Sequence, residues 1–166
     1  MRLSDHDIRD ELLGYLEYQR SSVHSIVEGL GEAAWHTPVV ASGWTVAGMI
    51  EHLGNMERHW FQQVIAGLST ELPWDEGRPP YASKMAFTCD RPSSDVLGYY
   101  RAQCDRSDQI LSSLSLSDAP RGRHGDDEIP NVHVVVLHVI EETAAHSGHL
   151  EIAREILDGK TGLGLR

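Results

Sequence analysis

Four segments of the sequence carry apolar residues at the three- and four-residue spacing of an amphipathic helix, and this pattern constrains the fold most. The segments cover about residues 4–30, 45–66, 93–114 and 132–158. Neither an internal repeat nor an alternating strand pattern accompanies them. Four long helices in a chain of 166 residues favour an all-α fold, a four-helix bundle around one core. We therefore predict a single helical bundle domain over residues 1–166.

Several residues mark where these helices begin and end. Thr45 is a candidate N-cap of the second segment, and Asn131 stands just before the fourth. Gly159 occupies the position of a C-terminal glycine cap. Residues 67–92 are rich in proline, glycine and acids, which predicts a long crossover between the second and third helices. Residues 114–130 are polar and predict the loop before the fourth helix.

Charge and composition argue against several classes of partner. A net charge of -11 argues against nonspecific binding to nucleic acid, which depends on Lys and Arg. No apolar run approaches the roughly 20 residues that span a bilayer, and the N-terminus has no signal-peptide core. Cys89 and Cys104 form no CxxC pair, which is typical of a reducing cytosol. We expect a cytoplasmic protein without nucleic-acid or membrane partners.

The fourth segment places polar residues among its apolar ones. With His138 at 0° on a helical wheel, Glu142 falls near about 40°, His146 near about 80° and His149 near about 20°. The apolar residues of the segment fall on the same side, between about -40° and 100°: Val135, Val139, Ala145, Ile152, Ala153, Ile156 and Leu157. The pattern predicts a carboxylate in the middle of the core-facing stripe. Because an unpaired carboxylate there costs several kcal/mol, it requires compensation.

Three compensations are open for Glu142. It can pair with a buried arginine or a histidine, it can be protonated, or it can bind a metal together with His146. Glu-xxx-His places two donors one turn apart on one helix face. His52 borders the apolar stripe of the second segment and is the candidate third ligand, with His59 as its neighbour. The alternative interpretation treats these histidines as structural residues.

Several motifs resemble the DinB superfamily. The "HL" at 52–53, the "WF" at 60–61 and the stretch "LHVIEETAAHSGHLEIAREILDGKTG" at 137–162 carry the resemblance. More narrowly, the chain is similar to the actinobacterial DinB-like domains related to mycothiol-dependent maleylpyruvate isomerase. The pattern E-E-T-A-x-H-x-G-H followed by R-E-x-x-D-G-x-T-G is the most specific part. The resemblance covers nearly the whole chain.

The resemblance implies a four-helix bundle with up-down-down-up topology and a divalent metal, commonly zinc or nickel, held by three side chains. Carried over residue by residue, these ligands are His52, Glu142 and His146. Many members have a third histidine where Glu142 stands, so this chain follows the isomerase-like pattern instead. Glu141 is then a solvated or supporting residue. A homodimer is also implied.

The function that the resemblance implies is a metal-dependent S-transferase that uses a low-molecular-weight thiol such as mycothiol on an electrophilic small molecule. His149 is the candidate base, or a donor to the ligand carboxylate. Two alternatives stay open: a metal-dependent hydrolase, and a metal-stabilised bundle that binds a ligand or partner without catalysis. An enzyme keeps a coordination position open. A structural site is closed by a fourth ligand, for which His149 and His59 are the candidates.

Overall fold

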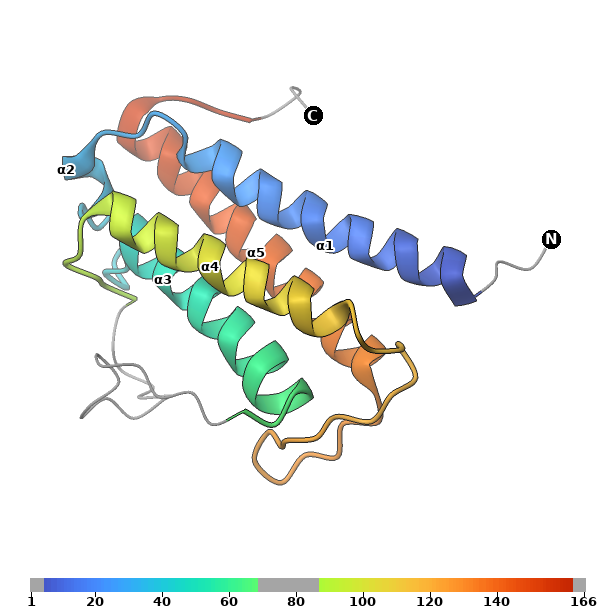
Figure 1. Ribbon diagram of the computed structural model, residues 1–166. Helices are drawn as coiled ribbons and strands as arrows, with labels where there is room; N and C mark the ends of the chain where they lie inside the picture. The colour runs from blue at the N-terminus through green and yellow to red at the C-terminus, as the bar shows by residue number, and fades with distance from the viewer. Residues whose placement is uncertain (1–4, 69–86, 163–166) are drawn as a thin grey trace.

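The computed structural model describes residues 5–68 and 87–162, and in these two stretches the chain is helical and forms no β-strand (Figure 1). The elements in chain order are α1 (Asp5–Val27), α2 (Glu32–Trp35), α3 (Val46–Glu57), the π-helix η1 (Arg58–Ile65), α4 (Ser93–Leu111) and α5 (Val132–Asp158). The predicted all-α class is therefore confirmed. Most of the predicted crossover, residues 69–86, lies outside the described residues.

The long helices lie side by side around one hydrophobic core. α1 packs along α5 and α3 along α4, and α3 also contacts α5 (Figure 1). Each long helix contributes fully buried side chains to the core: Leu16, Val23, Ile50, Leu53, Tyr100, Val139 and Leu150. Burial of one such side chain stabilises the fold by about 1.5–3 kcal/mol. The contact between α3 and α5 brings the histidine-bearing faces of these two helices together.

The predicted helix caps are present. The Thr45 hydroxyl oxygen accepts a hydrogen bond from the Gly48 amide at 3.1 Å, and the Asn131 side-chain oxygen accepts one from the Val134 amide at 3.1 Å. Both satisfy amide groups that have no partner within the first turn. Gly159 ends α5 in the left-handed conformation with φ of 75°, which glycine adopts without steric cost.

The predicted core-facing stripe of α5 is wrong by roughly a quarter turn. The buried residues of the helix are Val132, Val135, Val136, Val139, Thr143, Ser147, Leu150, Ala153 and Arg154. Ile152 and Ile156 are 58% and 56% exposed, and the Glu142 side chain is 40% exposed. The helical wheel counted these two outward-facing isoleucines as core residues, which shifted the predicted buried face toward them. Glu142 therefore lies at the edge of the buried face, and the large desolvation cost expected for it does not arise.

A π-helix that the sequence pattern did not predict follows directly after α3. The carbonyl oxygens of Val64 and Ile65 at its end accept hydrogen bonds from Gly122 and Arg121 of the α4–α5 loop, at 2.8 and 3.0 Å. A Cβ on Gly122 would lie 2.0 Å from the carbonyl oxygen of Gln63, so only glycine permits this approach. The loop is thereby fixed against η1.

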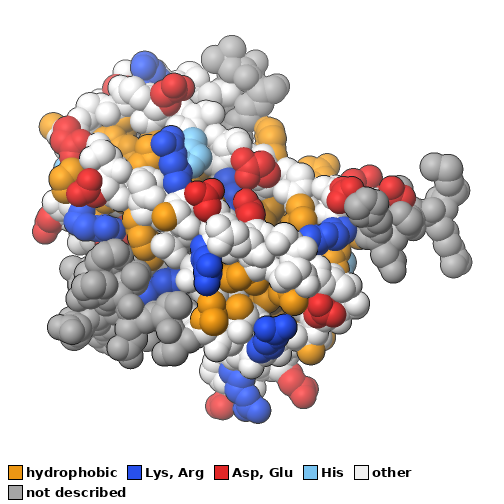
Figure 2. Space-filling view, viewed as in Figure 1, with side chains coloured by type: hydrophobic (Ala, Val, Ile, Leu, Met, Phe, Trp, Pro, Cys, Tyr) orange, Lys and Arg blue, Asp and Glu red, His pale blue; other side chains and the backbone are white. Residues whose placement is uncertain are grey.

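The surface shows no single class of side chain on the face drawn in Figure 2, where acidic, basic and apolar side chains alternate over α1 and α4. No helix within residues 5–68 and 87–162 has the length and apolar character that crossing a membrane requires.

Candidate metal centre

Three side chains from two helices converge where α3 and α5 are in contact. His52 comes from α3, and Glu142 and His146 come from successive turns of α5. One potential ligand atom from each residue lies within 4.8 Å of the other two. His146 Nε2 and Glu142 Oε2 are 3.4 Å apart, and the rings of His52 and His146 meet edge to face at 4.9 Å. The structure thus brings together the three residues singled out in the sequence.

Both histidines of this cluster have depressed pKa values. Burial lowers the pKa of His52 to about 4, and repulsion from His146 adds to the shift, while the Glu142 carboxylate opposes it. Burial also lowers the pKa of His146, again against the effect of Glu142. Each imidazole is therefore neutral near pH 7 and keeps a nitrogen lone pair, which is the form that binds metal ions.

The acidic member has a histidine partner and not an arginine. Glu142 lies within ion-pair distance of His146, and no arginine in residues 5–68 and 87–162 pairs with it; of the three buried arginines, Arg20 and Arg154 pair with Glu57 and Asp158. The alternative in which a buried arginine neutralises Glu142 is therefore not what the described residues show. Glu141, one residue before it, is exposed, as expected for a solvated side chain.

Phe87 orients one member of the cluster, and sequence reasoning missed it. Its ring stacks on the His52 imidazole at a centroid distance of 4.2 Å and an angle of 21°, and it meets His146 edge-on at 6.2 Å. The Phe87 carbonyl oxygen accepts a hydrogen bond from the Thr45 amide at 2.9 Å, which ties this segment to the start of α3. Nothing in the sequence pairs Phe87 with His52, since a long connection separates them.

Gly48 permits this arrangement. A Cβ at Gly48 would lie only 1.9 Å from the Phe87 carbonyl oxygen. We expect Gly48→Ala to displace Phe87 from His52 and to destabilise the protein by about 1–3 kcal/mol in urea unfolding. Gly98→Ala on α4 is the matched control, because a Cβ there meets no atom within 4 Å. It is expected to be neutral or to stabilise the fold by up to about 1 kcal/mol. Equal effects of the two substitutions would contradict the role of Gly48.

The other predicted histidines lie outside the cluster. The His149 ring is 5.6 Å from that of His146 and 6.3 Å from Trp44, so it borders the site from the exposed side of α5. The His138 ring packs against Trp60 at 4.5 Å. Among the described residues, no fourth His, Cys, Asp or Glu joins the three-residue cluster. The described residues thus offer three ligand-type side chains at this point.

His59, the other candidate fourth ligand, forms a separate network. Its Nε2 and Nδ1 atoms lie 2.9 Å from His124 Nδ1 and 2.8 Å from Gln63 Oε1. The Trp60 ring packs on the His124 ring at 4.6 Å. The α4–α5 loop brings His124 to His59 across 65 residues of sequence, so helical spacing gives no signal for this contact. The network attaches this loop to the end of the α3–η1 helix.

Comparison with known protein families shows to which family the chain belongs. The family model described as mycothiol-S-transferase matches residues 11–159, which is nearly the whole chain. The chain belongs to the mycothiol S-transferase family. The comparison with curated proteins finds no match.

Membership of the mycothiol S-transferase family confirms the resemblance to the DinB-like superfamily, to which that family belongs. The matched region contains the whole cluster of His52, Glu142 and His146. It also includes His149 and Phe87, whose rings lie beside those of His146 and His52. All three cluster residues are partly exposed, so a small molecule can reach them.

Proposed function

We propose that the protein is a metal-dependent mycothiol S-transferase that joins the thiol sulfur to an electrophilic small molecule. The observation that carries this proposal is the convergence of His52, Glu142 and His146 at one point in a chain of this family. The proposed fold is the DinB-like bundle, with up-down-down-up topology and one domain over residues 1–166. Helices from both ends of the described chain share its core.

The three side chains fit a divalent first-row metal. Two imidazole nitrogens and one carboxylate oxygen are donors that zinc and nickel accept. Ligand atoms at about 2.0 Å from a tetrahedral zinc ion are roughly 3.3 Å apart. The 3.4 Å between His146 Nε2 and Glu142 Oε2 is close to this value. His146 Nε2 is the proposed ligand atom, because it is the ring nitrogen that lies beside Glu142 Oε2.

A bound metal would lower the pKa of an entering thiol, so that the nucleophilic thiolate forms. In the transfer, the sulfur forms a bond to an electrophilic carbon, and the leaving group departs with its electron pair. His149, exposed beside His146, is the proposed acceptor of the thiol proton. The Phe87 ring keeps His52 oriented toward Glu142 and His146. We place the protein in the cytoplasm, which supplies the reduced thiol. Both cysteines of the chain are free, as expected in a reducing compartment.

The test is a conjugation assay on protein reconstituted with zinc or nickel. Mycothiol, cysteine and glutathione are each offered with monochlorobimane, and the thioether product is measured by fluorescence and mass spectrometry. We expect conjugation that depends on both the metal and mycothiol. Loss of the electrophile without thiol incorporation would favour the hydrolase instead. Metal-independent conjugation, or none with any thiol, would refute the proposal.

We also propose a homodimer that forms through the outer face of α5. Val134, Ile152 and Ile156 project outward from this helix and are 43%, 58% and 56% exposed. Exposed apolar residues repeated along one helix face are typical of an interface. We expect the wild type to sediment as a dimer at micromolar concentration and Ile152→Glu as a monomer. Asp105→Asn, at an exposed polar position of α4, is the control and should remain dimeric.

A further inference from the structure

One side of α5 faces away from the helices against which it packs and carries a regular set of side chains. This outer face includes five exposed residues: Val134, Glu141, Ala145, Ile152 and Ile156. They recur at alternating intervals of seven and four residues. Eleven residues make roughly three turns of an α-helix, so these side chains stay on one side along the whole length of α5. The outer face is therefore straight enough to pack along a second helix.

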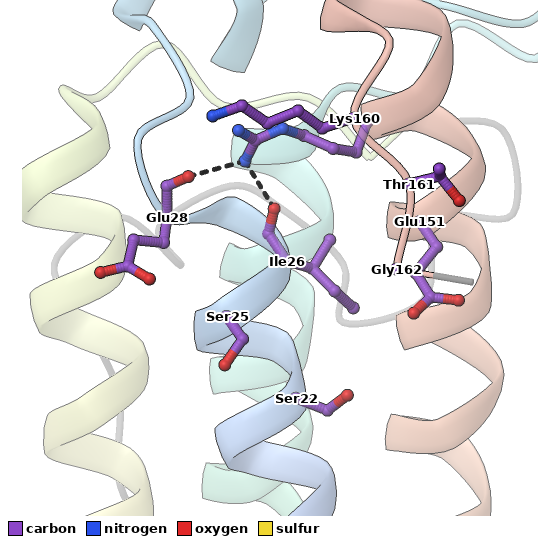
Figure 3. A pocket seen from close by; sticks show the side chains of 9 residues that line it. Ser22, Ser25, Ile26, Glu28, Glu151, Lys160, Thr161 and Gly162 are labelled. Carbon is purple, nitrogen blue, oxygen red and sulfur yellow. Dashed lines mark hydrogen bonds between the residues drawn. The ribbon is translucent and has the colours of Figure 1, made fainter. Parts of the chain in front are cut away.

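The opposite side of α5 is fixed by contacts within the chain. Arg154 is 5% exposed, and its Nη1 donates to the carbonyl oxygens of Ile26 and Glu28 at 2.6 and 2.9 Å (Figure 3). These two carbonyl groups lie at the end of α1. Val139, on the same side of α5 as Arg154, lies in the hydrophobic core. Because these contacts prevent α5 from rotating, covering Ile152 on the outer face requires a second molecule.

The charged residue of the outer face determines how a second α5 fits against it. Two parallel α5 helices would place Glu141 opposite Glu141 of the partner subunit, and these like charges repel. In an antiparallel pair with Ala145 at the twofold axis, Glu141 lies opposite His149 of the partner subunit. The reason is that Glu141 and His149 lie four positions before and four positions after Ala145. A carboxylate opposite an imidazole is a complementary contact, so the antiparallel arrangement is favoured.

The same register also pairs the apolar ends of the outer face. Val134 and Ile156 lie eleven positions before and eleven positions after Ala145, so each faces the other residue in the partner subunit. They are 43% and 56% exposed in the single chain. Ala145 at the axis and Gly148 beside it are small, and a Cβ on Gly148 would meet no atom of the chain within 4 Å. Small residues at the crossing point let two helices approach closely. One register thus satisfies the apolar and the charged positions together.

His149 has no orienting partner within its own chain. Its ring contacts those of His146 and Trp44, and no group in residues 5–68 and 87–162 forms a hydrogen bond with it. A histidine that accepts a proton is most effective when a carboxylate or carbonyl group holds its other ring nitrogen, which sets the tautomer and the ring orientation. Glu141 of the same chain is about 12 Å away along the helix, which is too far. Glu141 of the partner subunit is the carboxylate that the antiparallel register supplies.

We propose that two copies of the chain pack their α5 helices antiparallel about Ala145, and that Glu141 of each subunit orients His149 of the partner subunit. The carboxylate accepts a hydrogen bond from one ring nitrogen of that histidine and leaves the other nitrogen to take the thiol proton. Glu141 is thus a positioning residue that acts across the interface. The role of His149 rests on the proposed transferase function, whereas the register rests on the outer face of α5 alone.

The first experiment tests the register without any need for activity. Single-cysteine substitutions are made in the full-length protein, whose own two cysteines are buried, and treated with the short cross-linker bismaleimidoethane. Ala145→Cys should form a covalent dimer rapidly. Glu141→Cys and His149→Cys should each stay unlinked alone and should link to each other when the two variants are mixed and re-equilibrated. Asp105→Cys, at an exposed position of α4, is the control. Linking of Ala145→Cys no faster than the control, or linking of Glu141→Cys to itself, would overturn the register.

The second experiment tests whether the site is shared between subunits. Glu141→Gln should lower kcat for conjugation of mycothiol by about tenfold, with the KM for the thiol and the metal content unchanged. A mixed dimer of one Glu141→Gln and one His149→Ala subunit holds one native site, because the intact His149 meets the intact Glu141 of the other subunit. It should regain about half of the wild-type activity, which neither variant shows alone. No gain on mixing would overturn the role of Glu141.

A third readout does not depend on catalysis. Nitrogen-15 spectra of the histidine side chains report which ring nitrogen carries the proton. Glu141→Gln should change the tautomer of His149, whereas Glu155→Gln, at another exposed acid of α5, should not. Identical His149 signals in the wild type and Glu141→Gln would contradict the contact. A wild type that cross-links at Ala145→Cys and shows the tautomer change but conjugates no thiol would refute the transferase and support the interface.

Discussion

Alanine at either Glu142 or His146 is expected to remove the bound metal and the thiol-transfer activity together. Each substitution deletes one of three donors whose atoms lie within 4.8 Å of one another. Loss of a group that merely supports a ligand already weakens metal binding by about 10–100-fold, so loss of a ligand should exceed roughly 100-fold. Elemental analysis of untagged protein reconstituted with zinc, nickel or manganese measures the change, with competition against a chromophoric chelator for the affinity.

Two neighbouring substitutions serve as controls for this experiment. Glu141→Ala removes an exposed carboxylate next to Glu142, and His149→Ala removes an exposed imidazole near His146. Both should keep near one equivalent of metal, and His149→Ala should lower the rate of transfer without releasing the ion. Metal content that is unchanged in Glu142→Ala and His146→Ala, or absent from the wild type after reconstitution, would disprove the assignment.

The second large effect is expected from a buried ion pair between α1 and α3. Arg20 Nε and Nη2 each donate to a Glu57 carboxylate oxygen at 2.8 Å, and the two side chains are 3% and 0% exposed. Burial alone would lower the pKa of Arg20, but the Glu57 carboxylate outweighs it and holds that pKa above its ordinary value. Arg20→Leu leaves the Glu57 carboxylate buried and unpaired. We expect a loss of about 3–5 kcal/mol in the free energy of unfolding, measured in urea.

A double-mutant cycle separates the pair from its surroundings. Arg20→Leu combined with Glu57→Leu should restore much of the lost stability, because no buried charge is then left unpaired. Asp108→Asn is the control, since Asp108 accepts from Arg20 Nη1 at 2.7 Å but is 58% exposed. It should cost less than about 1 kcal/mol. Additive losses in the double variant would contradict this interpretation. A typical domain has only about 5–15 kcal/mol of stability, so either single variant approaches unfolding.

The helix ends were predictable because they depend on local chemistry. Thr45 and Asn131 cap their helices through hydrogen bonds to amides three residues further on, and Gly159 adopts the positive φ that a helix end favours. Each of these interactions closes within one turn of chain. The same locality explains the pair of Glu142 and His146, since residues four apart on a helix face the same side.

The orientation of α5 was not predictable from its apolar pattern alone. Ile152 and Ile156 face outward, while Thr143 and Arg154 are buried. A wheel assigns every apolar residue to the core, but polar groups can be buried when partners are present. Thr143 donates to the Val139 carbonyl oxygen, and Arg154 has the end of α1 and Asp158 as partners. A helical wheel could not predict the contact of Arg154 with the end of α1, because α1 is distant in sequence.

The helical segments, their caps and the proximity of Glu142 to His146 could be predicted, because all of these follow from backbone geometry over a few residues. The packing of the helices, in contrast, brings His52 to the same point, stacks Phe87 on it past Gly48 and pairs Arg20 with Glu57 in the core. These contacts join segments far apart in the chain. Their geometry is set by how the helices pack, and no spacing rule within one segment encodes that packing.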